Sequence, residues 1–145
     1  MHIFLGSDHR GFELKKQLML WLNNRQVTFT DCGATEYTPD DDYNDYAKQV
    51  AQALLSSEDP ESYGVLFCGS AQGMAMQANR YNGIRAAVCY NSTVAAEARS
   101  HNDANIACIP ASNPNISTAD ILTTFLSTPA LPDEKYQRRN HKLDE

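Results

Sequence analysis

The stretch of this sequence best suited to chemistry runs from Cys68 to Gly73. An apolar, strand-like segment ends in a thiol. Small residues follow at positions 69, 70, 71 and 73, and a helical pattern begins near Gln72. Closely spaced small residues let backbone N–H groups converge, and a helix that begins there adds partial positive charge. Such a loop suits a phosphate or a developing oxyanion, and its field would lower the pKa of the Cys68 thiol. The alternative is a small buried hydrophobe beside a tight turn.

Two familiar phosphate loops do not match this stretch. A Walker A loop ends in Gly-Lys followed by Ser or Thr, and no such ending is present. A phosphatase loop of the Cys-x5-Arg type requires an arginine at the position of Met74. A cysteine-dependent phosphatase, which would release inorganic phosphate, is therefore disfavoured.

Other polar residues gather where strand and helix patterns end. Asp8 and His9 follow the first apolar segment and suit either ligand binding or capping of the next helix. Residues 101–105, from His101 onward, suit either proton transfer or an ordinary helix exit. The acidic run 40–42 before Tyr43 lacks an EF-hand ligand pattern and is more typical of a solvated loop.

The hydrophobic pattern predicts five strands that alternate with helices. We expect strands over residues 1–6, 27–32, 63–68, 84–89 and 106–109. Helical spacing is found over 14–22, 46–54, 72–80 and 93–101, and after the capping box of Ser117 and Asp120. Parallel strands need crossover connections, so this alternation predicts a parallel sheet with helices on both faces. Residues 129–145 are expected to form a charged tail or helix.

The expected topology groups the candidate residues. Ligands of open parallel sheets bind beyond the carboxyl ends of the strands. This rule selects the segments 7–10 and 68–73 and the segment after the fourth strand. In the tail, Arg138 and Arg139 are either a solvated charge pair or a phosphate clamp.

Composition bounds the class of protein. A chain of 145 residues fits one domain over residues 1–145, and its 42% hydrophobic and 21% charged content is ordinary for a globular protein. The net charge of −6 argues against a nucleic-acid-binding surface. No apolar run is long enough to cross a bilayer, and charge comes too early for a signal peptide. We therefore expect a cytoplasmic location.

The four cysteines lie far apart, and none belongs to a CxxC pair. This spacing gives no support to tetrathiolate zinc binding or to thioredoxin chemistry. A disulfide framework is not expected for a chain of this size without a secretion signal.

The sequence contains four motifs in order: GSDHRGFELK, DYNDYA, CGSAQGMAMQANRYNGIRAAVC and ARSHNDAN, followed by QRR in the tail. Together they resemble the ribose-5-phosphate isomerase B family, which also includes allose-6-phosphate and galactose-6-phosphate isomerases, and the match to QRR is fainter. The resemblance implies a Rossmann-like three-layer α/β/α sandwich with a five-stranded parallel sheet. It implies a homodimer or homotetramer with shared active sites. The net charge and the short apolar runs noted above indicate no nucleic-acid or membrane partner.

The activity that this resemblance implies belongs to the pentose phosphate pathway. It is the conversion of ribose 5-phosphate to ribulose 5-phosphate through a cis-enediolate, without a metal or other cofactor. Cys68 would move the proton between C1 and C2, His101 would help open the sugar ring, and Ser70 would hydrogen-bond near the thiolate. The remaining implied substrate contacts come from the backbone of Gly69, Ala71 and Gly73, and from Asp8, His9, Tyr43, Asn102, Lys135 and Arg139.

The chain departs from the family's pattern in three places. Ala71 adds a Cβ where glycine is usual, and Ser112 stands where a phosphate-binding arginine is common. In the tail, Lys135 and Tyr136 stand where arginine and histidine are typical, and the lysine keeps the charge but loses the bidentate fork. These departures leave open a hexose phosphate as substrate, a non-catalytic sugar-phosphate-binding module, and the replacement of the missing arginine by Arg10 or Arg138.

Overall fold

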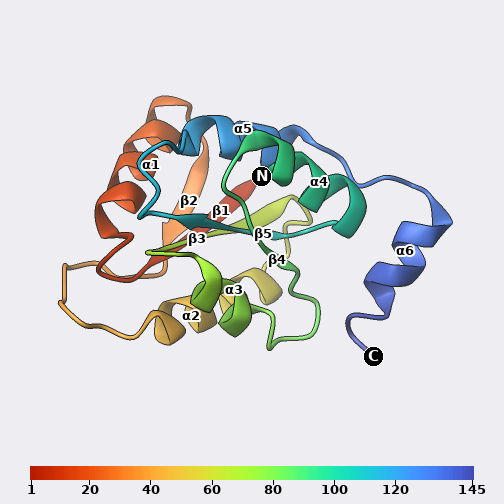
Figure 1. The fold of residues 1–145 in the computed structure, drawn as a ribbon, viewed down its shortest axis with the longest axis horizontal. Helices are drawn as coiled ribbons and strands as arrows, with labels where there is room; N and C mark the ends of the chain where they lie inside the picture. The colour runs from red at the N-terminus through yellow and green to blue at the C-terminus, as the bar shows by residue number, and fades with distance from the viewer.

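The computed structural model describes residues 1–145 as a three-layer α/β/α sandwich, which confirms the predicted fold class (Figure 1). One sheet has the order β2-β1-β3-β5-β4, and all four neighbouring pairs are parallel. The strands are β1 (His2–Ser7), β2 (Thr28–Asp31), β3 (Ser62–Cys68), β4 (Ala86–Val88) and β5 (Ile106–Pro110). The helices are α1 (Phe12–Asn24), α2 (Tyr43–Leu55), α3 (Gln72–Ala78), α4 (Ser92–Asn102), α5 (Thr118–Ser127) and α6 (Glu134–His141).

The side chains of the central strand β3 point alternately into the two halves of the core. Val65 and Phe67 pack under α1, α4 and α5, while Leu66 and Cys68 pack against α2 and α3. This alternation follows from the two-residue repeat of a strand, since both faces of a parallel sheet are buried. Figure 1 shows the two helical layers above and below the sheet. The apolar run that ends at Cys68 is therefore buried on both sides.

Side-chain caps fix the beginnings of α4, α5 and α6. Oδ1 of Asn91 accepts a hydrogen bond from the Val94 N–H at 2.8 Å, at the start of α4. The hydroxyl of Ser117 accepts from the Asp120 N–H at 3.3 Å, so the helix start predicted there is confirmed. Each cap satisfies a backbone donor that has no partner inside the helix.

One predicted strand is shorter than expected, and one helix buries a residue that the sequence pattern did not select. The strand expected over 84–89 is reduced to β4, because the N–H of Ile84 bonds to Tyr81 and that of Arg85 bonds to the side chain of Asn105. The buried face of α1 includes Lys15, which is fully buried although the apolar pattern did not select it.

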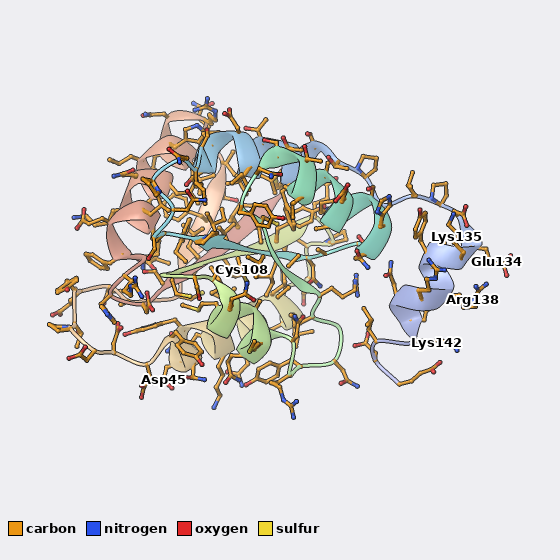
Figure 2. All side chains as sticks on the ribbon, in the orientation of Figure 1. Asp45, Cys108, Glu134, Lys135, Arg138 and Lys142 are labelled. Carbon is orange, nitrogen blue, oxygen red and sulfur yellow. The ribbon has the colours of Figure 1, made fainter.

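The end of the chain forms α6, which has no buried residue and lies apart from the sandwich (Figure 1). It contacts the end of α4, where the rings of His101 and Tyr136 stack at 4.9 Å and Asn140 donates to the His101 carbonyl. Lys135 and Arg138 lie on this outlying helix, and Lys142 follows its last residue (Figure 2). No helix in the structure is long and apolar enough to pass through a membrane.

Candidate active site

Three loops meet at the carboxyl edge of the sheet, because β3 lies between β1 and β5. Backbone hydrogen bonds join them. The N–H of Asp8 donates to the Phe67 carbonyl at 3.2 Å, and the N–H of Ala111 donates to the Cys68 carbonyl at 2.9 Å. The N–H of Ser112 donates to the Gly69 carbonyl at 3.0 Å. The segments that follow β1 and β3, which the sequence selected as candidate ligand-binding loops, therefore lie together at one edge of the sheet.

Cys68 is the last residue of β3, at this carboxyl edge, and it is only 5% exposed. Burial raises the pKa of the thiol, and the nearby Asp8 carboxylate raises it further. Hydrogen bonds from the backbone of Met74, Ala71 and Ser70 act in the opposite direction without reversing the shift. The expectation of a lowered pKa was therefore wrong. The field of a short helix does not offset the loss of hydration around the sulfur.

Ala71 occupies the left-handed region, with φ 64° and ψ −8°, just before α3. A residue with a Cβ pays about 1–2 kcal/mol for this conformation. The methyl group is fully buried in the cluster that α2 and α3 form over the sheet, which offsets part of that strain. The loop thus accepts alanine at the position where the family usually has glycine. The Ser70 hydroxyl accepts from the Gln72 N–H at 3.3 Å and so helps to shape the same loop.

Asp8 shapes the turn between β1 and α1. Its Oδ1 accepts hydrogen bonds from the backbone N–H groups of Arg10 and Gly11, both at 3.0 Å. Burial raises the pKa of its carboxyl, and the bond from Gly11 opposes this shift. A Cβ on Gly11 would lie 2.5 Å from the Phe67 carbonyl oxygen, so this turn requires glycine. These two bonds hold the turn before α1, but α1 itself has no side-chain cap, so the alternative of helix capping by Asp8 or His9 is wrong. The Asp8 carboxylate also lies close enough to the Cys68 sulfur to alter its titration.

His9 is held by the acidic loop that precedes α2. Oδ1 of Asp41 accepts from the His9 backbone N–H at 2.9 Å and lies 2.7 Å from Nδ1 of its ring. The Asp41 side chain is only 6% exposed, so the prediction of a solvated loop is wrong for this residue. Burial alone would raise the pKa of its carboxyl, but the hydrogen bonds from His9 and Tyr46 outweigh it and hold the pKa below its usual value. This arrangement leaves Nε2 of His9 available to a ligand.

Tyr43 lies against the first turn of α3. A Cβ on Gly73 would come within 2.6 Å of the Tyr43 ring, so glycine is what lets the ring approach the loop. Asn44 joins the same two helices through a 2.9 Å bond to Gln77. Asp8, His9, Tyr43 and the 68–73 loop are thus brought to one edge of the sheet.

Four other predicted residues lie elsewhere in the chain: His101, Asn102, Lys135 and Arg139. The α4 helix ends just before β5 begins, at the amino edge of the sheet, where the Asn105 carbonyl accepts from Gly64. Gly64 and Cys68 are separated by about 13 Å along β3, at about 3.3 Å per residue. A single chain therefore does not bring His101 to Cys68, and α6 lies at the same distant end (Figure 1).

Lys15 supports the site and was missed by sequence reasoning. Its ammonium group donates to Oδ1 of Asp31 at 2.5 Å and to the Ala34 carbonyl at 2.6 Å. Ala34 and Gly33 in turn exchange backbone hydrogen bonds with Ser7, at 3.0 and 2.8 Å. The buried lysine therefore ties the segment after β2 to the end of β1. Its only signal in the sequence was its helical spacing with Leu18 and Leu22.

The fold and this edge together are typical of a class of protein, the parallel α/β enzymes that bind a small ligand at the carboxyl ends of their strands. The chain matches the Ribose/Galactose Isomerase family over residues 3–143, and it belongs to that family.

Known structures and sequences agree with this assignment. The ribose 5-phosphate isomerase of Thermotoga maritima superposes with a TM-score of 0.90 at 41% identity, over 99% of this chain and 97% of that one. The isomerase B of Mycoplasma genitalium with bound ribulose-5-phosphate gives a TM-score of 0.88 at 32% identity, over 98% and 93% of the two chains. The ribose-5-phosphate isomerase B of Mycolicibacterium paratuberculosis is 36% identical over 140 residues, which cover 96% of this chain and 87% of that protein.

Proposed function

We propose that this chain interconverts ribose 5-phosphate and ribulose 5-phosphate, with Cys68 as the base that moves the proton between C1 and C2. The observation that carries the proposal is the position of the sulfur, at the end of the central strand and within reach of three backbone N–H groups. The relatives named as ribose-5-phosphate isomerases and the ribulose-5-phosphate-bound structure support the choice of substrate.

The reaction follows from ordinary carbonyl chemistry. The Cys68 thiolate takes the proton from C2 of the open-chain aldose, and the released electron pair forms a double bond between C1 and C2. The carbonyl oxygen at C1 becomes an oxyanion, which the N–H groups of the 69–73 loop stabilise by about 3–4 kcal/mol per donor. A proton passes from the C2 hydroxyl to the C1 oxygen, and the thiol returns its proton to C1. No step in this scheme requires a metal.

We infer roles for the surrounding side chains. Asp8 holds a sugar hydroxyl or the ring oxygen, and Nε2 of His9 contacts the phosphate. Tyr43 lines the pocket from the side of Gly73, because its ring already packs there.

A second copy of the chain would complete the site. His101 and Asn102 lie at the amino edge of the sheet, and α6 carries Lys135 and Arg139 there without burying any of its residues. We propose that these residues enter the pocket of a partner subunit in a homodimer or homotetramer. His101 would then open the sugar ring, Asn102 would bind the sugar, and the two cations would contact the phosphate.

The direct test is the formation of ribulose 5-phosphate from ribose 5-phosphate by the purified chain. We expect Cys68→Ala to lower kcat by about 10²–10⁴-fold, as is typical when a general base is lost. Turnover by the variant at the wild-type rate would remove Cys68 from the reaction. Absence of turnover by the wild-type protein on any sugar phosphate would refute the enzyme proposal.

Mixing two inactive variants tests the shared site. A dimer of one Cys68→Ala chain and one His101→Ala chain has one site with both changes and one intact site. Random association of equal amounts should therefore restore about a quarter of wild-type activity. A mixture that stays inactive after subunit exchange would show that both residues act within one chain.

Ser112 and the raised pKa of Cys68 favour a second candidate, a module that binds sugar phosphates without converting them. A panel of five- and six-carbon sugar phosphates separates the possibilities. Saturable binding without conversion identifies the module, and preferred turnover of a six-carbon substrate identifies a hexose-phosphate isomerase.

We also infer a cytoplasmic location. All four cysteines are free, which is typical of proteins in a reducing compartment.

A further inference from the structure

We propose that Arg10 supplies the positive charge that binds the substrate phosphate on the Cys68 side of the pocket, and that Ser112 holds it in position. This inference rests on the proposed function and names a residue that determines its specificity for phosphorylated sugars. It is carried by the place of the guanidinium group, by its hydrogen bond to Ser112 and by its lack of an acidic partner.

The guanidinium of Arg10 lies directly on the backbone of the cysteine loop. A Cβ on Gly69 would come within 2.5 Å of Cζ and 2.6 Å of Nη1 of Arg10, so the planar group packs against the bare Cα of the glycine. Gly69 follows Cys68 in the chain, which places this positive charge beside the residue that carries the reacting thiol.

Ser112 fixes the direction of the side chain from the other side of β3. Its hydroxyl accepts from Nη2 of Arg10 at 2.7 Å, while its own N–H donates to the Gly69 carbonyl at 3.0 Å. The serine is therefore attached both to the loop and to the arginine. A guanidinium group has five N–H donors in a rigid fork, so one bond to a hydroxyl leaves donors that can bind a phosphate in bidentate fashion.

The charge of Arg10 is not neutralised within the chain. It forms no ion pair, whereas Lys15 is paired with Asp31 and His9 is held by Asp41. The carboxylate closest in sequence, Asp8, accepts from the backbone of Arg10 and not from its guanidinium. An unpaired guanidinium that a neutral hydroxyl holds at the rim of a pocket is suited to an anionic ligand.

The position at the rim indicates which part of the substrate it meets. Arg10 is exposed, while Cys68 is buried at the bottom of the loop. The carbon atoms that exchange the proton must lie at the sulfur, so the phosphorylated end of the sugar extends outward, toward the guanidinium.

Kinetics on ribose 5-phosphate test the assignment. We expect Arg10→Ala to raise KM by about tenfold to a hundredfold, with a smaller change in kcat, because a charged hydrogen-bond donor to the phosphate is lost. Arg10→Lys should recover part of this loss, and Ser112→Ala should raise KM less than Arg10→Ala. Arg25→Ala is the matched control, because Arg25 stacks on Trp21 beside the opposite end of α1, and KM should stay unchanged.

Relocating the charge gives the sharpest test. The Arg10 fork and the Ser112 hydroxyl are in contact, so an arginine at position 112 would reach the same place. The double variant Arg10→Ala with Ser112→Arg should restore KM to within about threefold of wild type, if the charge at this point is what binds the phosphate. An unchanged KM in Arg10→Ala, or a double variant no better than the single one, would overturn the proposal.

Binding measured by calorimetry distinguishes a failure of the role of Arg10 from a failure of the proposed function. The wild-type chain should bind ribose 5-phosphate more tightly than ribose, and Arg10→Ala should lose most of that difference. If the wild-type chain binds in this way but does not isomerise, the function is refuted and the role of Arg10 stands. If it isomerises and Arg10→Ala keeps the full preference for the phosphorylated sugar, the role of Arg10 is refuted alone.

Discussion

Replacing Lys15 by alanine should destabilise the fold by about 4 kcal/mol. The residue is fully buried, and its ammonium donates to Asp31 and to the Ala34 carbonyl. Truncation removes three buried methylenes, worth about 0.8 kcal/mol each, or about 2.4 kcal/mol together. It also leaves the Ala34 carbonyl without this donor, at about 1–3 kcal/mol. The Asp31 side chain is 22% exposed and regains water, so we assign it no further cost.

Lys15→Met separates the two contributions, because it keeps the apolar stem and removes only the donors. We expect it to cost about 2 kcal/mol, roughly half the effect of alanine. Urea unfolding followed by circular dichroism measures both values, provided that the m-value is unchanged. Lys16→Ala is the control, because that exposed lysine makes only surface contacts, 3.7 Å from Glu13 and 5.5 Å from the Phe12 ring, and should change stability by less than about 0.5 kcal/mol.

A cost of less than about 1 kcal/mol for Lys15→Ala would contradict both contributions, since the loss of a buried stem and of a carbonyl's donor should together exceed that value. Equal values for alanine and methionine would show that the stem contributes nothing. A loss of about 4 kcal/mol corresponds to a fall in Tm of about 10 °C in a chain of this size, which calorimetry checks independently.

Three further predictions concern the carboxyl edge. The pKa of Cys68 is raised, so the rate of its alkylation by iodoacetamide should still increase above pH 9, as measured by mass spectrometry of each cysteine. Asp8→Asn should move the midpoint of this rate–pH curve to lower pH. An unchanged midpoint would exclude the carboxylate as a cause of the shift. Gly11→Ala should cost about 1–3 kcal/mol in urea unfolding, because its Cβ meets the Phe67 carbonyl at 2.5 Å, and a neutral result would mean that the turn adjusts freely. The pKa of Asp41 is lowered in the folded chain, so its contribution to stability is present above its unfolded pKa of about 3.9 and is lost as pH falls through the folded value. Asp41→Asn should therefore flatten that part of the stability–pH curve. Parallel curves for the variant and the wild type would contradict the pairing with His9.

Local patterns in the sequence predicted most of the fold. The apolar run before Cys68 has the length and bounding residues of a buried strand, and β3 is found there. The cap at Ser117 predicted the start of α5, because it depends only on a hydroxyl and on an N–H three residues later in the chain. The order of the strands was not predicted, because pairing depends on contacts between segments far apart in the chain.

Predictions of the site failed where burial decided the outcome. The sequence places Cys68 before a helix, which suggests a lowered pKa, but only the packed structure reveals how little water reaches the sulfur. Asp41 looked like one of three solvated acids until the fold placed its carboxylate against His9. The distance between His101 and Cys68 was accessible in principle. A helix that leads into a strand ends at the amino edge of a parallel sheet, and Cys68 ends a strand at the other edge.

The pocket at the carboxyl edge is joined by main-chain atoms. The bonds from Asp8 to Phe67, from Ala111 to Cys68 and from Ser112 to Gly69 all run from backbone N–H to backbone carbonyl. Such bonds survive most substitutions, because almost every residue type has the same donor and acceptor. Side chains at the exposed rim, such as those of residues 10 and 112, can therefore differ while these main-chain bonds keep the loops together. We therefore expect substrate preference to change through mutations at the rim, and a library that varies positions 10 and 112 would test this while the main-chain bonds stay in place.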